Sequence, residues 1–373
     1  MAKKKKKTPD EIREGITSKM VDALSEGTPP WRQPWSSSPN AGHPCNFASG
    51  RRYTGINPLI LMLASMTNGY GSRHWGTYDS WTKETGGHVT KGEHGTQIAF
   101  YRMFPKKDEH GKPEFTEGGK PKMIPYFTVW SLFNVEQVQA PTVESLLKMG
   151  KEDLLALAEK QLKKAAQPKP SLTKPVIAKA IHEGVEAKLK KYHAEVGEVR
   201  NRDPDFKPAE ELIVATGAVI SYDGSKACYS PSSDKITMPP KGRFDNVSHF
   251  YETAFHELTH WSESPKRVGK RERKDKGGDK YAFGELVAEI GACFLCAELQ
   301  IPLADQMIQH SRGYVKHWLG KMQSDPKFIF DASSQASKTS DYLLSFVGRE
   351  NIEVEEKPKA KRKARKPRAR KVA

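Results

Sequence analysis

Two histidines near the middle of the chain have the spacing of a metal site. The segment Phe255–Trp261 holds His256 and His260 four residues apart, with Glu257 directly after the first. On a helix this spacing puts both imidazoles on one face, where they can bind one zinc ion. Glu257 is then placed to take a proton from a water molecule that the metal activates. We therefore predict a hydrolytic zinc site; the alternative is a solvated helix face that carries these residues by chance.

A catalytic zinc site needs a third protein ligand and one open position. Glu285 and Glu289 are the best candidates, because they stand four residues apart in a segment, 281–299, that we expect to be one helix. Their neighbours are apolar nearly all round, and a buried carboxylate needs a partner such as a metal. From the residues alone, either glutamate can bind zinc while the other hydrogen-bonds an imidazole.

The next helical segment offers residues that can assist catalysis. His310, Tyr314 and Trp318 follow one another at four-residue spacing. A tyrosine or histidine that reaches the metal can stabilise the oxyanion of a tetrahedral intermediate. Tyr314 and His310 are therefore candidate catalytic residues, and ordinary packing is the equal alternative for both.

A compact pattern of elements surrounds the metal segment and predicts an α+β domain over residues 209–347. The expected elements are a helix at 210–216, strands at 218–221, 227–229 and 235–238, and the metal-binding helix at 247–262. A strand next to the metal helix is where zinc peptidases bind an extended substrate by β-augmentation.

The chain up to residue 140 is rich in aromatic side chains with basic residues between them. Such a pattern suits single-stranded DNA, because bases stack on the rings while lysine and arginine follow the phosphates. The alternative is that most of these rings fill the core of a small α+β domain, and composition favours neither interpretation. The candidate nucleic-acid-binding residues are Trp31, Arg32, Trp35, Arg51, Arg52, Tyr53, Arg73, Trp75, Trp81 and Lys91.

Hydrophobic periodicity predicts the elements of this first domain, residues 9–140. We expect helices over 9–27, 58–67 and 78–85, and strands over 96–104 and 126–133 joined by a polar loop. Residues 141–208 change in character and contain two helical stretches separated by prolines. We interpret them as a helical linker or insertion, to which the sequence assigns no function.

The strongly basic character of the chain belongs to its ends. The formal net charge is +16 over 373 residues, yet Lys3–Lys7 and 357–373 alone hold fifteen basic residues. Without those fifteen, 46 basic residues face 45 acidic ones. We expect disordered basic tails at 1–8 and 348–373 that bind nucleic acid through its phosphates without sequence choice. Tails that only keep the chain soluble are the alternative.

Cysteine usage and hydropathy limit the cellular compartments in which the protein is expected. The four cysteines are too few and too scattered for a disulfide scaffold, which fits a reducing environment. Cys293 and Cys296 are expected on a buried helix face. The chain has no run of 18 apolar residues and no apolar segment after its lysine-rich start, so we expect neither membrane span nor signal peptide. These features indicate a cytoplasmic protein; its oligomeric state is open.

Several motifs resemble one known family. Three segments resemble the N-terminal domain of ArdC-type antirestriction proteins: GTPPWRQPW, GRRYTGINPLIL and SRHWGTYDSWTKETGGHVTKGEHGTQIAFY. Related segments occur in plasmid TraC-type primases. The zincin-like metallopeptidase domain of the same proteins is similar to ATGAVISYDGSKACYSPSSDKITMPP, HELTHWSES, YAFGELVAEIGACFLCAEL and GYVKHWLGKM. The resemblance covers residues 9–140 and 209–347.

This resemblance implies a single-stranded-DNA-binding domain joined to a gluzincin-like zinc metallopeptidase domain. It implies a phage or plasmid protein that protects incoming DNA from host restriction, with a host protein as peptide substrate. The segment GELVAE is similar to the gluzincin ligand motif E-x-x-A-D, which favours Glu285 as metal ligand and Glu289 as its hydrogen-bonding neighbour. Two alternatives are a DNA-coating protein with a structural or inactive zinc site, and a primase-associated DNA-binding protein.

Overall fold

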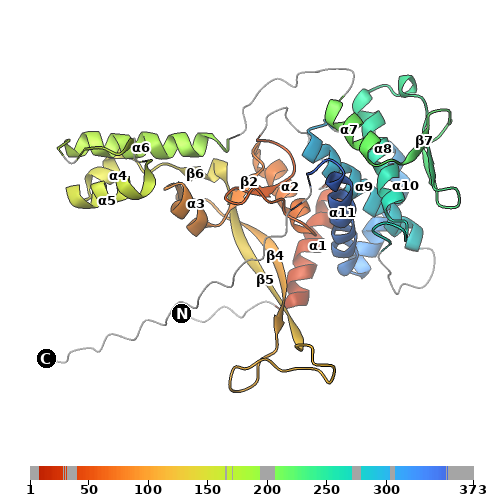
Figure 1. Cartoon of the computed structure of the whole chain (residues 1–373), viewed down its shortest axis with the longest axis horizontal. Coiled ribbons are helices and arrows are strands. Elements are labelled where there is room, and N and C mark those ends of the chain that lie inside the picture. The colour runs from red at the N-terminus through yellow and green to blue at the C-terminus, as the bar shows by residue number, and fades with distance from the viewer. Residues whose placement is uncertain are drawn as a thin grey trace.

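The computed structural model has mixed α and β structure, as the sequence predicts (Figure 1). It describes residues 8–27, 29, 31, 40–163, 166–169, 171–193, 206–270, 279–302, 307–349 and 351, with the side chains at 102, 125, 279 and 307–313 left out. The predicted basic tails lie almost wholly outside the described residues. Within the described part, no helix combines the length and apolar character that crossing a membrane requires.

The N-terminal region is built around a four-stranded sheet of order β1-β2-β5-β4. Its helices and its two long strands lie where hydrophobic periodicity predicts them, whereas strands of two or three residues carry no pattern that would predict them. The elements are α1 (Pro9–Ser25), β1 (Cys45–Asn46), α2 (Asn57–Asn68), β2 (His74–Gly76), α3 (Tyr78–Glu84), β3 (His88–Val89), β4 (Thr96–Pro105), β5 (Met123–Asn134) and β6 (Val138–Gln139).

Local signals define the ends of these helices. Thr8 and Glu11 form a capping box at the start of α1, where Pro9 occupies the first turn. Gly69 ends α2 with φ at 72°, a left-handed conformation that glycine adopts without the strain of a side chain.

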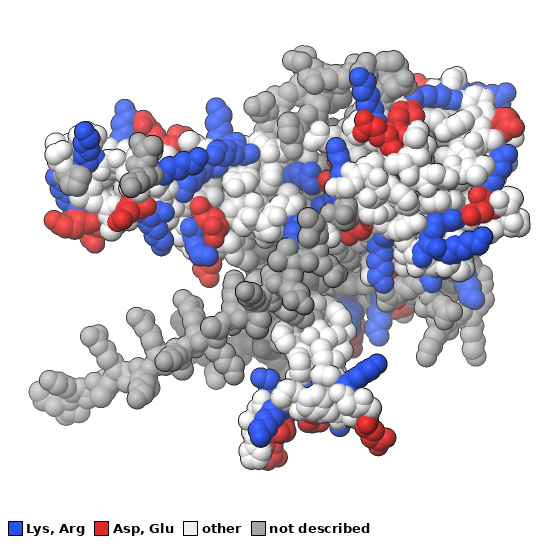
Figure 2. Space-filling view, in the orientation of Figure 1, with Lys and Arg blue, Asp and Glu red and all other residues white. Residues whose placement is uncertain are grey.

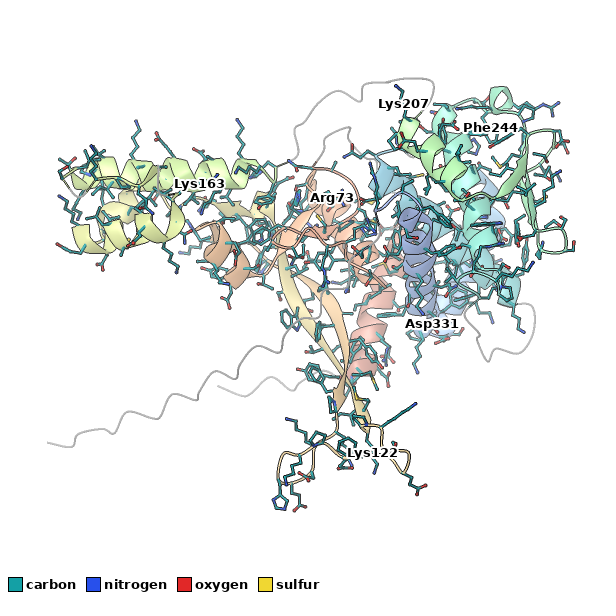
Figure 3. All side chains as sticks on the ribbon, in the orientation of Figure 1. Arg73, Lys122, Lys163, Lys207, Phe244 and Asp331 are labelled. Carbon is teal, nitrogen blue, oxygen red and sulfur yellow. The ribbon has the colours of Figure 1, made fainter. Side chains whose placement is uncertain are left out.

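Strands β4 and β5 form a long antiparallel ribbon. They pair without interruption from Thr96 opposite Leu132 to Pro105 opposite Met123. The far half of this ribbon extends away from the rest of the chain (Figure 1), and Lys122 lies near its tip (Figure 3). We call residues 100–105 and 123–130 the arm.

Three helices that follow the first domain pack against it and extend to one side (Figure 1). They are α4 (Val143–Leu147), α5 (Lys151–Gln161) and α6 (Lys174–Lys190). Sequence periodicity suggests one helix across α4 and α5, but Gly150 caps a new helix at Lys151. Buried leucine, isoleucine and valine side chains of this insertion share a core with Phe47 and Trp81 of the N-terminal region. The described part of the insertion is therefore anchored to the first domain.

The C-terminal region combines a small sheet with a helical bundle. Its elements are α7 (Lys207–Ala215), β7 (Val219–Ser221), β8 (Cys228–Ser230), β9 (Lys235–Thr237), α8 (Val247–Ser262), α9 (Asp279–Leu299), α10 (Met307–Ser324) and α11 (Lys327–Ser345). The strand order β7-β9-β8 leaves β8 at an edge, beside α8. A Cβ atom added at Gly291 would lie 2.9 Å from the Thr259 side chain, so glycine permits the close approach of α9 to α8.

The N-terminal and C-terminal regions share one hydrophobic core. It contains Trp31 and Trp75 from the first region and Phe294, Trp318 and Phe328 from the second. Trp31 meets Trp318 edge to face, with ring centroids 6.3 Å apart. Because this core crosses the boundary, the two regions stabilise one another.

Candidate metal centre

The side chains of α8 and α9 converge on one point. The Nε2 atoms of His256 and His260 lie 3.2 Å apart. Oε2 of Glu285 lies 3.5 Å from His256 Nε2, and its Oε1 lies 3.4 Å from His260 Nε2. The three side chains are 16–17% exposed, so the group is sheltered but reachable. Two imidazole nitrogens and one carboxylate form the three-ligand set of a catalytic metal site.

A carboxylate stands behind each imidazole. Oε2 of Glu289 is 4.0 Å from His256 Nδ1, and Oε2 of Glu263 is 4.0 Å from His260 Nδ1. Both glutamates are buried. Carboxylates in this position hold ligand rings in orientation and fix their tautomer. The geometry thus places Glu285 beside the Nε2 atoms, as a ligand, and Glu289 behind His256, as a supporting group. It also adds Glu263 as a supporting group, which sequence analysis missed although it follows His260 by three residues.

Burial and ion pairing set the charge states of this cluster. Burial alone would lower the pKa of His256, but its hydrogen bond with Glu285 and the charges of Glu257 and Glu289 raise it. Burial alone would raise the pKa of Glu285, but hydrogen bonds with both imidazoles lower it well below its usual range. Burial raises the pKa of Glu263 to about 7. Glu285 is therefore ionised more readily than Glu263.

Glu257 lies between the histidines and the edge strand β8. The residue is 7% exposed, and its carboxylate accepts a hydrogen bond from the backbone N–H of Tyr229. Burial raises the pKa of Glu257, against the lowering effect of His256 and His260. A carboxyl group with a raised pKa in this position suits proton transfer near neutral pH.

An arginine holds the strand pair β8–β9 against the end of α8. The guanidinium of Arg267 lies 3.8 Å from the centre of the Trp261 ring, and its Nε donates to the Trp261 carbonyl over 2.6 Å. It also binds the carboxylate of Asp234 in the turn between the two strands. These contacts of Arg267 hold the edge strand β8 beside Glu257. Among the described strands, only β9 pairs with β8. The outer edge of β8 can therefore accept a further strand.

Tyr314 reaches the cluster through a second tyrosine. Tyr281 hydrogen-bonds with Tyr314 and with Glu285, and these contacts raise its pKa. The rings of Tyr281 and Tyr314 are 6.0 Å apart, and Tyr314 stacks on Trp318. Sequence analysis missed Tyr281, although it precedes Glu285 by one helical turn. The predicted His310 belongs to α10, but its side chain lies outside the described residues.

Most aromatic residues predicted to bind DNA are buried. Trp31 is 1% exposed, and Trp75 and Trp81 are 0% exposed. Tyr53 is buried enough to raise its pKa strongly. The three tryptophan rings present no face on which a base could stack, which corrects the expectation for them. They belong to the core, the alternative that composition left open, and Trp35 lies outside the described residues.

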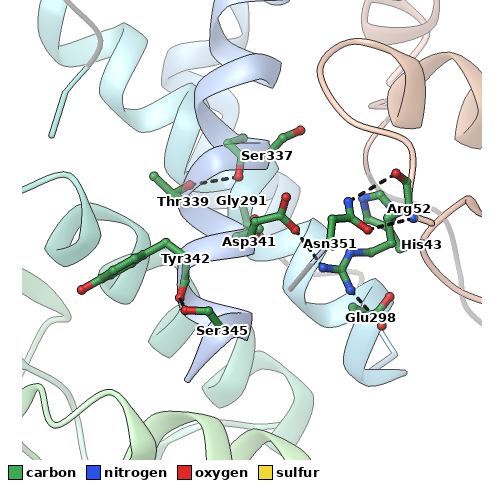
Figure 4. Close-up of polar contacts among 12 residues, drawn as sticks. His43, Arg52, Gly291, Glu298, Ser337, Thr339, Asp341, Tyr342, Ser345 and Asn351 are labelled. Carbon is green, nitrogen blue, oxygen red and sulfur yellow. Dashed lines mark hydrogen bonds and ion pairs between the residues drawn. The ribbon is translucent and has the colours of Figure 1, made fainter. Parts of the chain in front are cut away.

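Two of the predicted arginines, Arg52 (Figure 4) and Arg73, instead join the two regions. Arg52 pairs with Asp341 at 2.8 Å and with Glu298 at 3.3 Å, while Arg73 pairs with Glu298 at 2.8 Å. The side chains of both arginines are largely buried, so the charges that sequence analysis assigned to phosphates are neutralised within the chain. Asn351 adds hydrogen bonds with the Arg52 backbone.

The remaining predicted DNA-binding residues are Lys91, Arg51 and Arg32. Lys91 is exposed and Arg51 is half-buried. Arg32 lies outside the described residues.

Comparisons with known proteins agree with this division. Residues 10–133 match the family model described as the N-terminal domain of anti-restriction factor ArdC, and residues 207–335 match the model of a zincin-like metallopeptidase. Crystal structures of the antirestriction protein ArdC from plasmid R388 superpose on the chain. The metal-free form has a TM-score of 0.61 and 28% identity over 91% of this chain and 99% of that one. The Mn(II)-bound form has a TM-score of 0.59 and 29% identity over 91% and 98%.

Sequence relatives include two proteins named DNA primase TraC from Escherichia coli. Each is 29% identical over 90% of this chain, but the chain spans only 27% and 20% of their lengths. The protein y4eC of Sinorhizobium fredii (strain NBRC 101917 / NGR234) is 27% identical over 90% of this chain and 92% of its own length.

The metal-bound relative supports a divalent-metal site at His256, His260 and Glu285. The chain therefore combines a region that matches the ArdC N-terminal domain with one that matches a zincin-like metallopeptidase domain.

Proposed function

We propose that the C-terminal domain hydrolyses peptide bonds with a zinc ion held by His256, His260 and Glu285. The observation that carries this proposal is the convergence of their ligand atoms beside Glu257 and the edge strand β8. A bound zinc ion acts as a Lewis acid that polarises a carbonyl and lowers the pKa of water. Two nitrogens and one carboxylate match the donor preference of zinc.

The chain supplies the remaining steps. The outer edge of β8 binds the substrate as an added strand, which places a backbone carbonyl near Glu257. Glu257 accepts a proton from the attacking water and passes it to the leaving amine. Tyr281, held by Tyr314, donates a hydrogen bond to the oxyanion of the tetrahedral intermediate. Glu289 and Glu263 keep the two imidazoles in orientation.

We propose that the complete protein binds single-stranded DNA and protects incoming DNA from host restriction, with a host protein as the peptide substrate. The match to the ArdC N-terminal domain and the likeness to an antirestriction protein support this function. The basic tails contribute phosphate contacts. Deletion of residues 357–373 therefore flattens the dependence of DNA affinity on salt, and an unchanged slope argues against a role for the tail.

The variant Glu257→Ala tests whether hydrolysis is part of the protection. It leaves all three metal ligands in place, so it retains zinc and single-stranded DNA while peptide cleavage is lost. Glu211→Ala, at an exposed position of α7, serves as control. New N-termini in recipient-cell proteins report cleavage, and survival of transferred DNA in a restricting host reports protection.

The outcomes separate two functions. Loss of both cleavage and protection in Glu257→Ala supports the metallopeptidase proposal, and unchanged cleavage contradicts it. Full protection without cleavage favours the alternative, a DNA-coating protein whose zinc site is structural or inactive.

A further inference from the structure

The arm exposes large aromatic side chains on one face. Residues opposite each other in an antiparallel pair lie on the same side of the ribbon. The pairing of Ile98 with Trp130, Arg102 with Tyr126 and Phe104 with Ile124 therefore defines one face. We call Phe100, Phe104, Tyr126 and Trp130, all on this side, the aromatic face.

The rings of the aromatic face form two groups along the ribbon. Phe100 and Trp130 stack with centroids 5.2 Å apart, and Phe104 meets Tyr126 edge to face at 5.6 Å. Trp130 is 48% exposed, Tyr126 43% and Phe104 39%. Tyr126 and Trp130 are four residues apart on one strand, so the two groups are separated by about 13 Å.

The rings of the aromatic face remain partly exposed in the described chain. Among the described strands, β4 and β5 pair only with each other beyond the base of the ribbon. A two-stranded ribbon gains little stability by itself, and contiguous exposed apolar surface usually marks a binding site. The uncharged surface of the arm is visible between the body of the protein and the charged tip (Figure 2).

The charges around the aromatic face favour a polyanion. Strands β4 and β5 contain no aspartate or glutamate, and their only charged residue is Arg102, which stands opposite Tyr126 in the strand pairing. Lys106 and Lys122 continue the ladder beyond it, joined by a backbone hydrogen bond of 2.7 Å. Both pair with Glu114, and the other acidic residues of this connection are confined to the loop 108–117.

We infer that the aromatic face of the arm is the stacking platform on which this protein binds the bases of single-stranded DNA. This inference rests on the proposed DNA-binding function and locates the bound DNA on the arm. Flat rings on strands that carry an arginine and no carboxylate match bases joined by phosphates. An interface between two copies of the chain would not require strands that lack carboxylates.

The opposite face of the ribbon differs and supplies a control. Phe127 is half-buried there, with the guanidinium of Arg13 from α1 4.8 Å from its ring centre. Tyr101 is 57% exposed on that face, and its hydroxyl donates to the sulfur of Met103 over 3.1 Å. Tyr101 therefore matches Tyr126 in type and exposure but not in face.

The test measures the affinity of the full chain for a fluorescent fifteen-nucleotide oligo-dT by anisotropy. Trp130→Ala and Tyr126→Ala should each weaken binding at least about fivefold, because each removes one stacking ring. Trp130→Phe keeps a ring and should recover most of the affinity, whereas Tyr101→Ala should bind as wild type does. The slope of affinity against salt should stay constant in Trp130→Ala, since the ring carries no charge.

Each other result overturns the inference. Equal affinity of wild type and both alanine variants places DNA elsewhere and leaves the proposed DNA binding intact. Failure of the wild type to bind the oligonucleotide removes both the inference and the DNA part of the proposed function. Sedimentation distinguishes the competing occupant: if Trp130→Ala dissociates an oligomer without loss of DNA affinity, the face binds a second copy of the chain.

Discussion

At the metal centre charged side chains are withdrawn from water, whereas on the arm aromatic side chains are exposed to it. Glu289 and Glu263 are 3% and 2% exposed, while Trp130 and Tyr126 are 48% and 43% exposed. Each region departs from the usual distribution of residues, in opposite directions. Buried carboxylates need a partner, and the two imidazoles with a metal provide it. Exposed aromatic surface usually marks a binding site, and in our account the binding partner is DNA.

The first prediction compares two tryptophans of the N-terminal region. Trp75 is fully buried and Trp130 is half exposed. Trp75→Ala leaves a cavity and should lower the free energy of unfolding by about 3–5 kcal/mol. Trp130→Ala should change it by no more than about 0.5 kcal/mol, as at other exposed sites. Chemical denaturation measures both values. Similar losses in the two variants would break the distinction between core rings and arm rings.

The second prediction concerns the ligand carboxylate. Among the described residues, Glu285 is the only carboxylate placed between both Nε2 atoms. Zinc affinity should therefore fall by more than about a hundredfold in Glu285→Gln, beyond the cost of losing a supporting group. Titration calorimetry against zinc measures this change, with the exposed Glu211→Gln as matched control. Wild-type affinity in Glu285→Gln would place the metal elsewhere.

The third prediction separates supporting carboxylates from the ligand. Glu289→Gln and Glu263→Gln remove groups 4.0 Å from the Nδ1 atoms, so each should weaken zinc binding by about ten- to a hundredfold. The same titration ranks them below Glu285→Gln. If Glu289→Gln were the most damaging of the three, Glu289 would be the ligand and Glu285 its neighbour.

The smallest expected effect belongs to an exposed charge near the centre. Hydrogen bonds from Arg267 lower the pKa of Asp234 to about 2, below the usual value of 3.8. A lowered carboxyl pKa stabilises the fold above the usual value, and this contribution is lost as the pH falls from about 4 to 2. Solvent screens the exposed pair, so the contribution should be under about 1 kcal/mol. Thermal unfolding of Asp234→Asn against wild type should differ slightly at pH 6 and less at pH 3; a difference that grows on acidification contradicts this.

The metal centre could be predicted from sequence because its geometry is local. His256, Glu257 and His260 share one helix, so their spacing alone fixes their relative positions. The residues alone left Glu285 and Glu289 as alternatives on a second, apolar helix, and the resemblance of GELVAE to the gluzincin ligand motif favoured Glu285. Glu263 and Tyr281 stand at helical spacing from His260 and Glu285, and could have been found by searching one turn on either side of each ligand.

The DNA-binding surface could not be predicted in the same way, because burial in the first domain depends on distant partners. Trp81 is covered by the insertion helices, which follow it in sequence. Arg52 and Arg73 meet Glu298 and Asp341 at the other end of the chain. Trp75 and Trp130 both lie in strands, and only tertiary packing buries the first and exposes the second. The fold class followed from periodicity, whereas the face that each ring presents did not.

The most direct measurement is the anomalous diffraction of crystals grown with zinc. Our account predicts one strong peak bonded to Nε2 of His256, Nε2 of His260 and the carboxylate of Glu285, at about 2.0–2.2 Å. It also predicts that Glu257 is close to the peak but is not bonded to it. Glu252, Glu289 and Cys293 form a second group of ligand-type atoms, buried behind His256. A peak in that group, with none at the histidine Nε2 atoms, would contradict the account.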